Sequence, residues 1–321
     1  IELVYASMFQ MTHSNPFISI VAPGFNESEN IDAFYERTSN VLKTLTERWE
    51  IIFVNDGSRD DTLEKLEKIR EHDHRLKIIS LSRNFGKEAA LTAGLDHADG
   101  DVIVPIDVDL QDPPELIVEM LAHWRQGYEV VYATRKSRKG ESWFKRFTAK
   151  AFYRVCNRLS DINIPLDTGD FRLIDRKVLN SLKTVREKHR FMKGLFAWVG
   201  YKQISIPYER EERHSGQTKW NYFSLLNLAI EGITSFSIRP LQFATYFGFL
   251  VSSLSFIYAV FIVLKTLIYG VDVKGYASIL VAILFFGGVQ LIFIGILGEY
   301  IGRIYNEVKN RPLYLIDKVE K

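Results

Sequence analysis

The sequence predicts an α/β domain with a mostly parallel sheet, followed by amphipathic interfacial helices and a hairpin of two transmembrane helices. The first observation is that short apolar runs alternate with helical patterns in the N-terminal part, which is typical of a parallel sheet with right-handed crossovers. The second is that two uncharged stretches, residues 243–264 and 276–297, follow this part. Each exceeds the ~20 apolar residues that a helix needs to cross a bilayer.

The apolar runs are expected to be buried strands, and the segments between them helices. Strands are predicted at residues 17–22, 50–54, 76–81, 102–106 and 130–134, with an edge strand at 202–208. Apolar residues at helical spacing predict helices that end near Leu45 and that cover 87–97 and 114–124. Carboxyl ends of parallel strands meet at one edge of a sheet. The polar residues after these strands should therefore line one crevice.

Asp107, Asp109 and Gln111 follow the predicted strand at 102–106 and offer only oxygen ligands. Mg²⁺ and Mn²⁺ prefer such ligands, and Mg²⁺ also binds through substrate phosphates. The alternative is a strand end with solvated acids, because Asp-x-Asp is common in polar loops. The sequence has no G-x-G-x-x-G after its first strand and no P-loop motif, which argues against a dinucleotide fold and a P-loop phosphate site.

A basic amphipathic segment is predicted at 135–160, where cations alternate with aromatic residues. It suits a membrane surface, and the alternative is a helix packed on the domain with a solvated basic face. A second amphipathic helix is expected at 221–240, leading into the first span. Between these segments, Gly169 predicts a turn, with Asp170 beside Arg172 as an acid–cation pair.

The two spans, within 241–303, are joined by a short link and therefore form a hairpin. Arg239 precedes the hairpin, and Arg303 and Lys309 follow it. The positive-inside rule then places both chain ends and the N-terminal α/β domain, 14–220, in the cytoplasm at the inner (plasma) membrane, with 304–321 as a cytoplasmic tail. Residues 1–13 are expected to be a tag or a disordered start. The single cysteine excludes an internal disulfide and indicates a reducing compartment.

Gly298 and Gly302 form a Gly-x-x-x-Gly pattern in the second span. This pattern permits close helix packing, either within the hairpin or between copies of a homo-oligomer.

Several short segments together resemble motifs of the family 2 inverting glycosyltransferases with a GT-A fold. They are Pro23-Gly24-Phe25-Asn26-Glu27, Asn55-Asp56-Gly57-Ser58, Arg83-Asn84-Phe85-Gly86-Lys87, the block from Asp107 to Glu115, and Gly169-Asp170-Phe171-Arg172. More narrowly, the chain is similar to polyisoprenyl-phosphate glycosyltransferases, such as bactoprenyl-phosphate glucosyltransferases and dolichyl-phosphate mannose synthases. The similarity runs from about residue 17 to the end and includes the hairpin.

The resemblance implies a role for each matching residue. The nucleotide-sugar donor would be held by Pro23, Phe25, Glu27, Asp56, Lys87 and Asp107. Asp107, Asp109 and Gln111 would hold Mg²⁺ or Mn²⁺ on its diphosphate. The lipid phosphate and the leaving group would be served by Arg135, Arg172, Arg213 and Lys219, with Asp170 near the acceptor.

The activity that the resemblance implies is inverting transfer of glucose from UDP-glucose to polyprenyl (undecaprenyl) phosphate at the cytoplasmic membrane face. Mannose from GDP-mannose and an aminoarabinose-type sugar from its UDP donor are the alternatives. A processive synthase would need more spans and a Gln-x-x-Arg-Trp signature, which the sequence lacks. The presence of Asp107, Asp109 and Gln111 argues against a non-catalytic scaffold that only binds nucleotide sugar. Expected partners are the nucleotide sugar, the lipid phosphate and the bilayer, with no nucleic acid.

Overall fold

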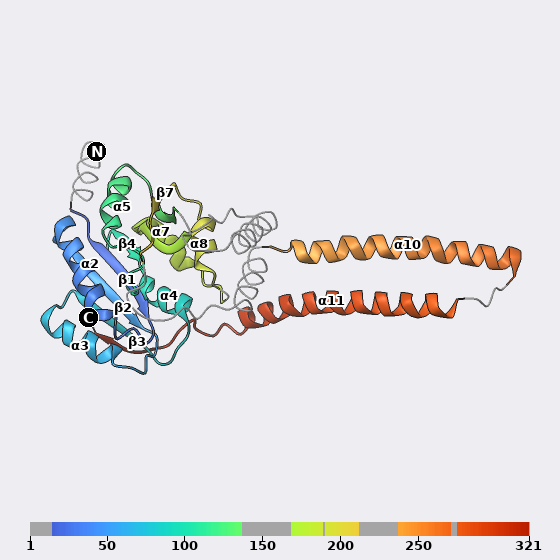
Figure 1. The fold of residues 1–321 in the computed structure, drawn as a ribbon, viewed down its shortest axis with the longest axis horizontal. Coiled ribbons are helices and arrows are strands. Elements are labelled where there is room, and N and C mark those ends of the chain that lie inside the picture. Colours follow the sequence, from blue (N-terminus) through green and yellow to red (C-terminus); the bar gives the residue numbers. More distant parts are fainter. Residues whose placement is uncertain (1–14, 137–167, 189, 212–236, 271–274, 321) are drawn as a thin grey trace.

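The structure, a computed structural model, describes residues 15–136, 168–188, 190–211, 237–270 and 275–320 (Figure 1). Most of the basic segment at 135–160 and of the amphipathic helix at 221–240 lies outside these residues, as do Arg213 and Lys219. The described chain forms an α/β domain from which a hairpin of two long helices extends (Figure 1).

The described residues of the domain form one eight-stranded sheet in the order β7-β5-β6-β4-β1-β2-β3-β8. Its strands are β1 (Ile18–Gly24), β2 (Trp49–Asn55), β3 (Leu76–Leu81), β4 (Val102–Pro105), β5 (Val130–Arg135), β6 (Thr168–Asp175), β7 (Gln203–Tyr208) and β8 (Ile316–Glu320). Only β6 and β8 run against the others, so the predicted mostly parallel sheet is confirmed. The central strands β1, β2 and β4 are buried along almost their whole length because helices cover both faces of the sheet.

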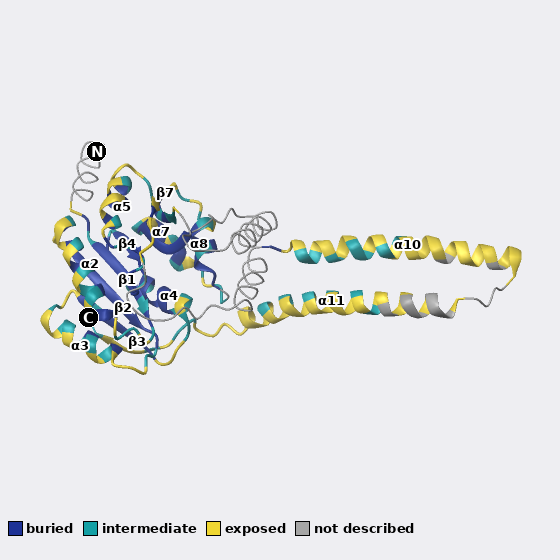
Figure 2. Ribbon diagram, viewed as in Figure 1, coloured by how far each residue is buried: buried dark blue, intermediate teal, exposed yellow. Residues whose placement is uncertain are grey.

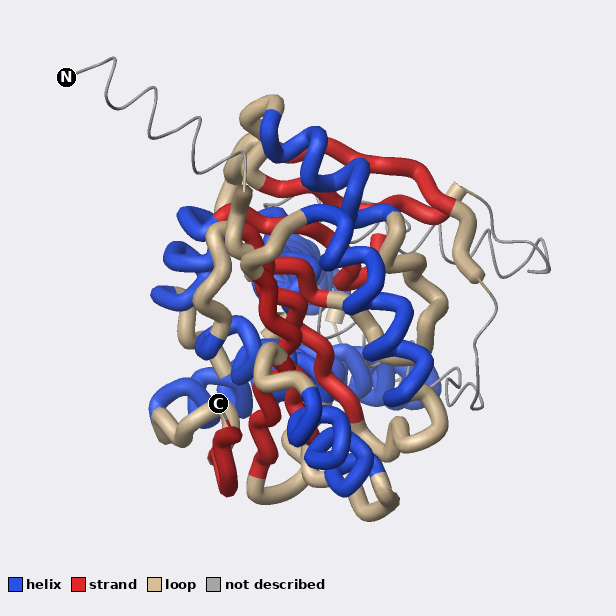
Figure 3. The backbone as a smooth tube through the Cα atoms, turned by 90° about the vertical axis from the view of Figure 1, so that its left-hand side faces the viewer, coloured by secondary structure: helices blue, strands red, loops and turns tan. Residues whose placement is uncertain are grey.

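Helices pack on both faces of the sheet, and each face has its own apolar core (Figures 2 and 3). α2 (Ile31–Leu45), α3 (Thr62–His72) and α5 (Leu116–Arg125) contribute to one core. α4 (Lys87–His97), α7 (Arg176–Thr184) and α8 (Met192–Trp198) contribute to the other. This layered arrangement leaves the carboxyl edge of the parallel strands open for a ligand.

Two strands differ from the sequence expectation. The turn predicted at Gly169 is wrong, because 168–175 form β6, which pairs antiparallel with both β4 and β5. The last residues, expected only to form a tail, include β8, which pairs antiparallel with the edge strand β3. The C-terminus therefore returns from the hairpin to the sheet.

The hairpin consists of α10 (Arg239–Tyr269) and α11 (Tyr276–Val308). Both contain stretches long and apolar enough to cross a membrane, and none of the residues whose burial the structure describes in these stretches is buried (Figure 2). Such exposed apolar surface indicates membrane association. Among the described residues, a Cβ added to Gly298 or Gly302 would meet no atom within 4 Å, so neither glycine makes a close contact with α10.

Candidate active site

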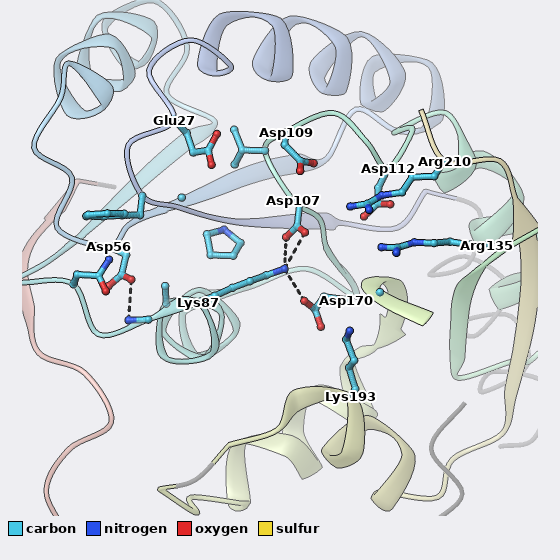
Figure 4. Close-up of a pocket in the computed structure, with 18 residues that line it drawn as sticks. Glu27, Asp56, Lys87, Asp107, Asp109, Asp112, Arg135, Asp170, Lys193 and Arg210 are labelled. Atoms are coloured by element: carbon cyan, nitrogen blue, oxygen red, sulfur yellow. Dashed lines mark hydrogen bonds and ion pairs between the residues drawn. The ribbon is translucent and has the colours of Figure 1, made fainter. Parts of the chain in front are cut away.

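A cavity of about 580 Å³ opens at the carboxyl edge of the sheet (Figure 4). The ends of β1, β2, β4 and β5, the start of β6, and helices α4 and α8 supply its walls. Its lining includes six carboxylates (Glu27, Asp56, Asp107, Asp109, Asp112 and Asp170) and four cations (Lys87, Arg135, Lys193 and Arg210). The strand-end acids therefore converge as the sequence predicts.

At one end of the cavity, Asp56 holds the loop that precedes α4. Its buried carboxylate accepts hydrogen bonds from the backbone N–H groups of Phe85, at 2.7 Å, and Gly86, at 2.9 Å. Burial raises the pKa of Asp56, while these two hydrogen bonds act in the opposite direction. Glu27 lies at the same end and accepts a hydrogen bond from the side-chain amide of Asn30 at 2.7 Å.

In the centre, the ammonium group of Lys87 bridges two carboxylates (Figure 4). It lies 2.6 Å from Asp107 Oδ1 and 2.7 Å from Asp170 Oδ2. Burial lowers the pKa of Lys87, but the two carboxylates outweigh this effect and hold it well above its ordinary value. Burial would raise the pKa of Asp170, yet the charges of Lys87 and Lys193 bring it far below its usual range. Asp170 is thus an ionised carboxylate at neutral pH.

The expected metal ligands are only partly brought together. Asp107 and Asp109 both line the cavity, and Asp109 is buried. Gln111 is not part of the lining, and its backbone N–H donates to Asp109 Oδ1 at 3.2 Å. Between Asp109 and Gln111 the chain turns with Leu110 at φ 58°, a left-handed conformation that costs a leucine ~1 kcal/mol or more. Such strain is concentrated at functional sites.

The oxygen atoms of Asp107 and Asp109 fit a hard divalent cation whose remaining ligands come from the substrate. Among the described residues, no three acidic, histidine or cysteine side chains converge as a metal site. Two carboxylates plus diphosphate oxygens are, however, the usual way in which proteins hold Mg²⁺. The excess of carboxylates over cations in the lining also favours a bound cation.

Of the two expected phosphate-binding arginines that the structure describes, one lines the cavity and the other does not. Arg135 lines the cavity, and its Nε has no hydrogen-bond partner among the described residues. Arg172 does not line it. Its buried guanidinium lies 3.9 Å from the ring centroid of Phe196 and donates to the carbonyl of Gly169 at 2.8 Å. Burial lowers the pKa of Arg172 to about 10, and in this position it supports β6 rather than facing a ligand.

Sequence reasoning missed three charged residues of the cavity: Asp112, Lys193 and Arg210. Asp112 belongs to the Asp-x-Asp block and is buried, with its carboxylate accepting a hydrogen bond from the hydroxyl of Tyr208. Its place in that block was a usable signal. Lys193 and Arg210 carry no such signal, because α8 is short and residues 209–211, which follow β7, have no regular structure.

This fold and cavity define a glycosyltransferase of the GT-A type. Residues 19–183 match Glycosyl transferase family 2, and residues 239–304 match the GtrB C-terminal hairpin. The chain therefore belongs to glycosyl transferase family 2, and the resemblance seen in its motifs is confirmed.

Curated relatives match over almost their whole length. An uncharacterized glycosyltransferase of Synechocystis sp. is 57% identical over 93% of this chain and 94% of its own. The prophage bactoprenol glucosyl transferase homolog of Escherichia coli (strain K12) is 48% identical over 95% of this chain and 99% of its own. The bactoprenol glucosyl transferase of Shigella phage SfII is 48% identical, with 94% and 97% covered.

Proposed function

We propose that this enzyme transfers glucose from UDP-glucose to a polyprenyl phosphate, with inversion at the anomeric carbon. The observation that carries the proposal is the joining of a nucleotide-sugar cavity to a hairpin of membrane-spanning length in one chain. The names of the bactoprenol glucosyl transferases support the choice of sugar and lipid.

The donor would enter with its nucleoside toward Asp56 and Glu27 and its diphosphate toward Asp107 and Asp109. Pro23 and Phe25 line the nucleoside end. Asp107 and Asp109 would hold Mg²⁺ or Mn²⁺, and a bound divalent cation neutralises charge on a departing diphosphate. Lys87 would supply a further positive charge beside the donor.

The reaction would be a single displacement. An oxygen of the acceptor phosphate attacks the anomeric carbon, the bond from that carbon to the diphosphate oxygen breaks, and UDP departs with the bonding electrons. An α-linked donor then gives a β-linked lipid phosphate sugar. The second pKa of a phosphate monoester is near ~6, so the acceptor is already largely deprotonated at neutral pH.

The geometry around Asp170 supports a positioning role over a role as general base. Its pKa lies far below its usual range and one of its oxygens is paired with Lys87. Efficient bases have pKa values near the working pH, so this carboxylate would be a weak base. Catalysis would therefore depend on positioning and charge neutralisation.

The orientation that we propose places the catalytic domain and both chain ends in the cytoplasm. It is supported by Arg239 at the start of α10 and by Lys309 and Arg311 after α11. At this face, the enzyme would meet cytoplasmic nucleotide sugars and the phosphate head of a lipid in the inner leaflet.

A panel of nucleotide sugars with polyprenyl phosphate tests the proposal. We expect turnover with UDP-glucose, loss of turnover in EDTA, and a β-anomeric product by NMR. Turnover confined to GDP-mannose or to a UDP-aminoarabinose donor would replace the sugar assignment. An α-linked product or a trapped glycosyl-enzyme would overturn the mechanism, and donor binding without transfer to any lipid phosphate would overturn the proposed function.

A further inference from the structure

Lys193 lines the cavity but has no role in the proposed binding of the nucleotide-sugar donor. It lies on α8 and is half-buried, and Figure 4 shows its side chain directed toward Asp170, away from Asp56 and Glu27. Lys87 is engaged by two carboxylates, whereas Lys193 makes no ion pair within the described part of the chain. Its ammonium group is thus available to an incoming anion.

The helix that carries Lys193 lies on the membrane side of the domain. Figure 1 shows α8 on the side from which the hairpin extends. The backbone N–H of Lys188, just before α8, donates to the carboxylate of Glu307 near the end of α11, at 2.9 and 3.2 Å. A lipid phosphate that rises from the bilayer beside the hairpin would therefore meet the α8 wall of the cavity.

The position of α8 is fixed from within the domain. Phe196 and Leu195 are buried in the core against the sheet, and Phe196 also contacts the guanidinium of Arg172. At the other end, the side chain of Met192 is fully buried in the same core. Lys193 is therefore held at the cavity by a helix that is anchored in the core.

A phosphate acceptor needs such a cation at this point. Asp170 is ionised, and its Oδ1 has no hydrogen-bond partner among the described residues, so an unscreened phosphate would be repelled. Burial lowers the pKa of Lys193, although the charge of Asp170 acts against this. A partly desolvated ammonium group gains more from a new anionic partner than an exposed one does.

We propose that Lys193 binds the phosphate group of the lipid acceptor and that α8 forms the acceptor wall of the cavity. The assignment rests on the proposed function and adds to it a residue on the acceptor side. Arg135, which also lines the cavity near Asp170, would contact the same phosphate. The nucleotide sugar would not depend on Lys193.

The test compares Lys193→Met, Lys193→Arg and Lys202→Met in the full-length enzyme in detergent. Lys202 is an exposed lysine outside the cavity, so its variant is the matched control. Loss of a charge-assisted contact should raise the KM for polyprenyl phosphate about ten- to a hundredfold in Lys193→Met. The Kd of UDP-glucose by calorimetry should stay within about twofold, Lys193→Arg should recover most of the loss, and Lys202→Met should match the wild type.

The outcomes separate this inference from the proposed function. If the wild type transfers no sugar to any polyprenyl phosphate, the proposed function is wrong. If the wild type is active and Lys193→Met keeps its acceptor KM, only the assignment of Lys193 fails. Equal weakening of UDP-glucose binding would place Lys193 on the donor side and also overturn the assignment, provided that the melting temperature shows a folded variant.

Discussion

Replacing Lys87 by methionine should destabilise the protein, because it removes the cation shared by Asp107 and Asp170. Methionine keeps most of the side-chain volume, so the change isolates the charge. Removing one partner from a buried ion pair costs ~3–5 kcal/mol, while an exposed pair contributes ~1 kcal/mol or less. The side chain of Asp170 is 9% exposed, but those of Lys87 and Asp107 are 45% and 28% exposed. Solvent screening therefore reduces the expected loss to ~2 kcal/mol.

This loss should depend on pH. In the wild type, the lowered pKa of Asp170 contributes stability that is present above its unfolded pKa of ~3.9 and is lost as the pH falls through the folded pKa. Without Lys87, burial of Asp170 is opposed by fewer cations, and its folded pKa rises. The variant then regains stability relative to the wild type as acid protonates this carboxyl group, so the difference should shrink toward pH ~4.

Thermal unfolding of the full chain in detergent, followed by tryptophan fluorescence, measures both effects. For a domain of this size ~1 kcal/mol corresponds to ~2–4 °C, so Lys87→Met should melt ~4–8 °C lower at pH 8 and by less at pH 4.5. Lys68→Met is the control, because Lys68 makes an ion pair at 2.7 Å with Glu64 on an exposed helix surface. It should show no measurable shift. An unchanged melting temperature in Lys87→Met, or an equal drop in both variants, would refute the reasoning.

Further predictions concern the metal, a half-buried acid and the C-terminal strand. Asp109→Asn should abolish most turnover in a folded enzyme, and full activity of the wild type in EDTA would contradict the metal assignment. Burial, followed by the charge of Asp170, raises the pKa of Glu88 to about 7. The raised pKa of Glu88 therefore costs stability, which is lost progressively as the pH rises from its unfolded pKa of ~4.3 to this folded value, so Glu88→Gln should melt higher than the wild type at pH 8 but not at pH 4.5; equal differences at both values would argue against it. Ending the chain at Leu315 removes β8 and should reduce turnover of membrane-embedded polyprenyl phosphate several-fold, with little change for a short soluble prenyl phosphate. Equal losses on both acceptors would indicate damage to the fold.

The convergence of Asp56, Asp107 and Asp109 could be predicted from sequence because it follows from strand direction alone. Once apolar runs identify parallel strands, the residues after them must share one edge of the sheet. The strand β6 escaped prediction because Gly169, Asp170 and Arg172 are unusual in a buried strand. Its stability depends on partners distant in sequence, such as the ring of Phe196 beneath Arg172.

The strand β8 and the residue Lys193 were missed for different physical reasons. β8 is a short, polar edge strand, and its pairing is determined by the edge of β3 rather than by its own composition. α8 has only seven residues, too few for a helical period to identify its cavity-facing side chain. Both features depend on tertiary contacts that periodicity does not encode.

The directions of the edge strands place both connections to the hairpin at the edge of the sheet where the cavity opens. β7 runs parallel to β5, and Tyr208, at its carboxyl end, pairs with Arg135 at the cavity. The chain therefore leaves for the hairpin from the carboxyl edge of the sheet. It returns at the same edge, because β8 is antiparallel to β3 and begins at Ile316, opposite Leu81 at the carboxyl end of β3.

These two connections lie at opposite ends of the strand order, since β7 and β8 are the edge strands. The hydrogen bond from the hydroxyl of Tyr314 to Asp96 Oδ2, at 2.7 Å, fixes the returning chain just before β8. A hairpin attached at both edges of the sheet has less freedom to swivel than one attached through a single linker. Each CH₂ of the lipid chain that is drawn out of the bilayer into water costs ~0.8 kcal/mol of free energy. The acceptor phosphate can therefore be reached only by a cavity close to the membrane, and the two connections to the hairpin hold the cavity there.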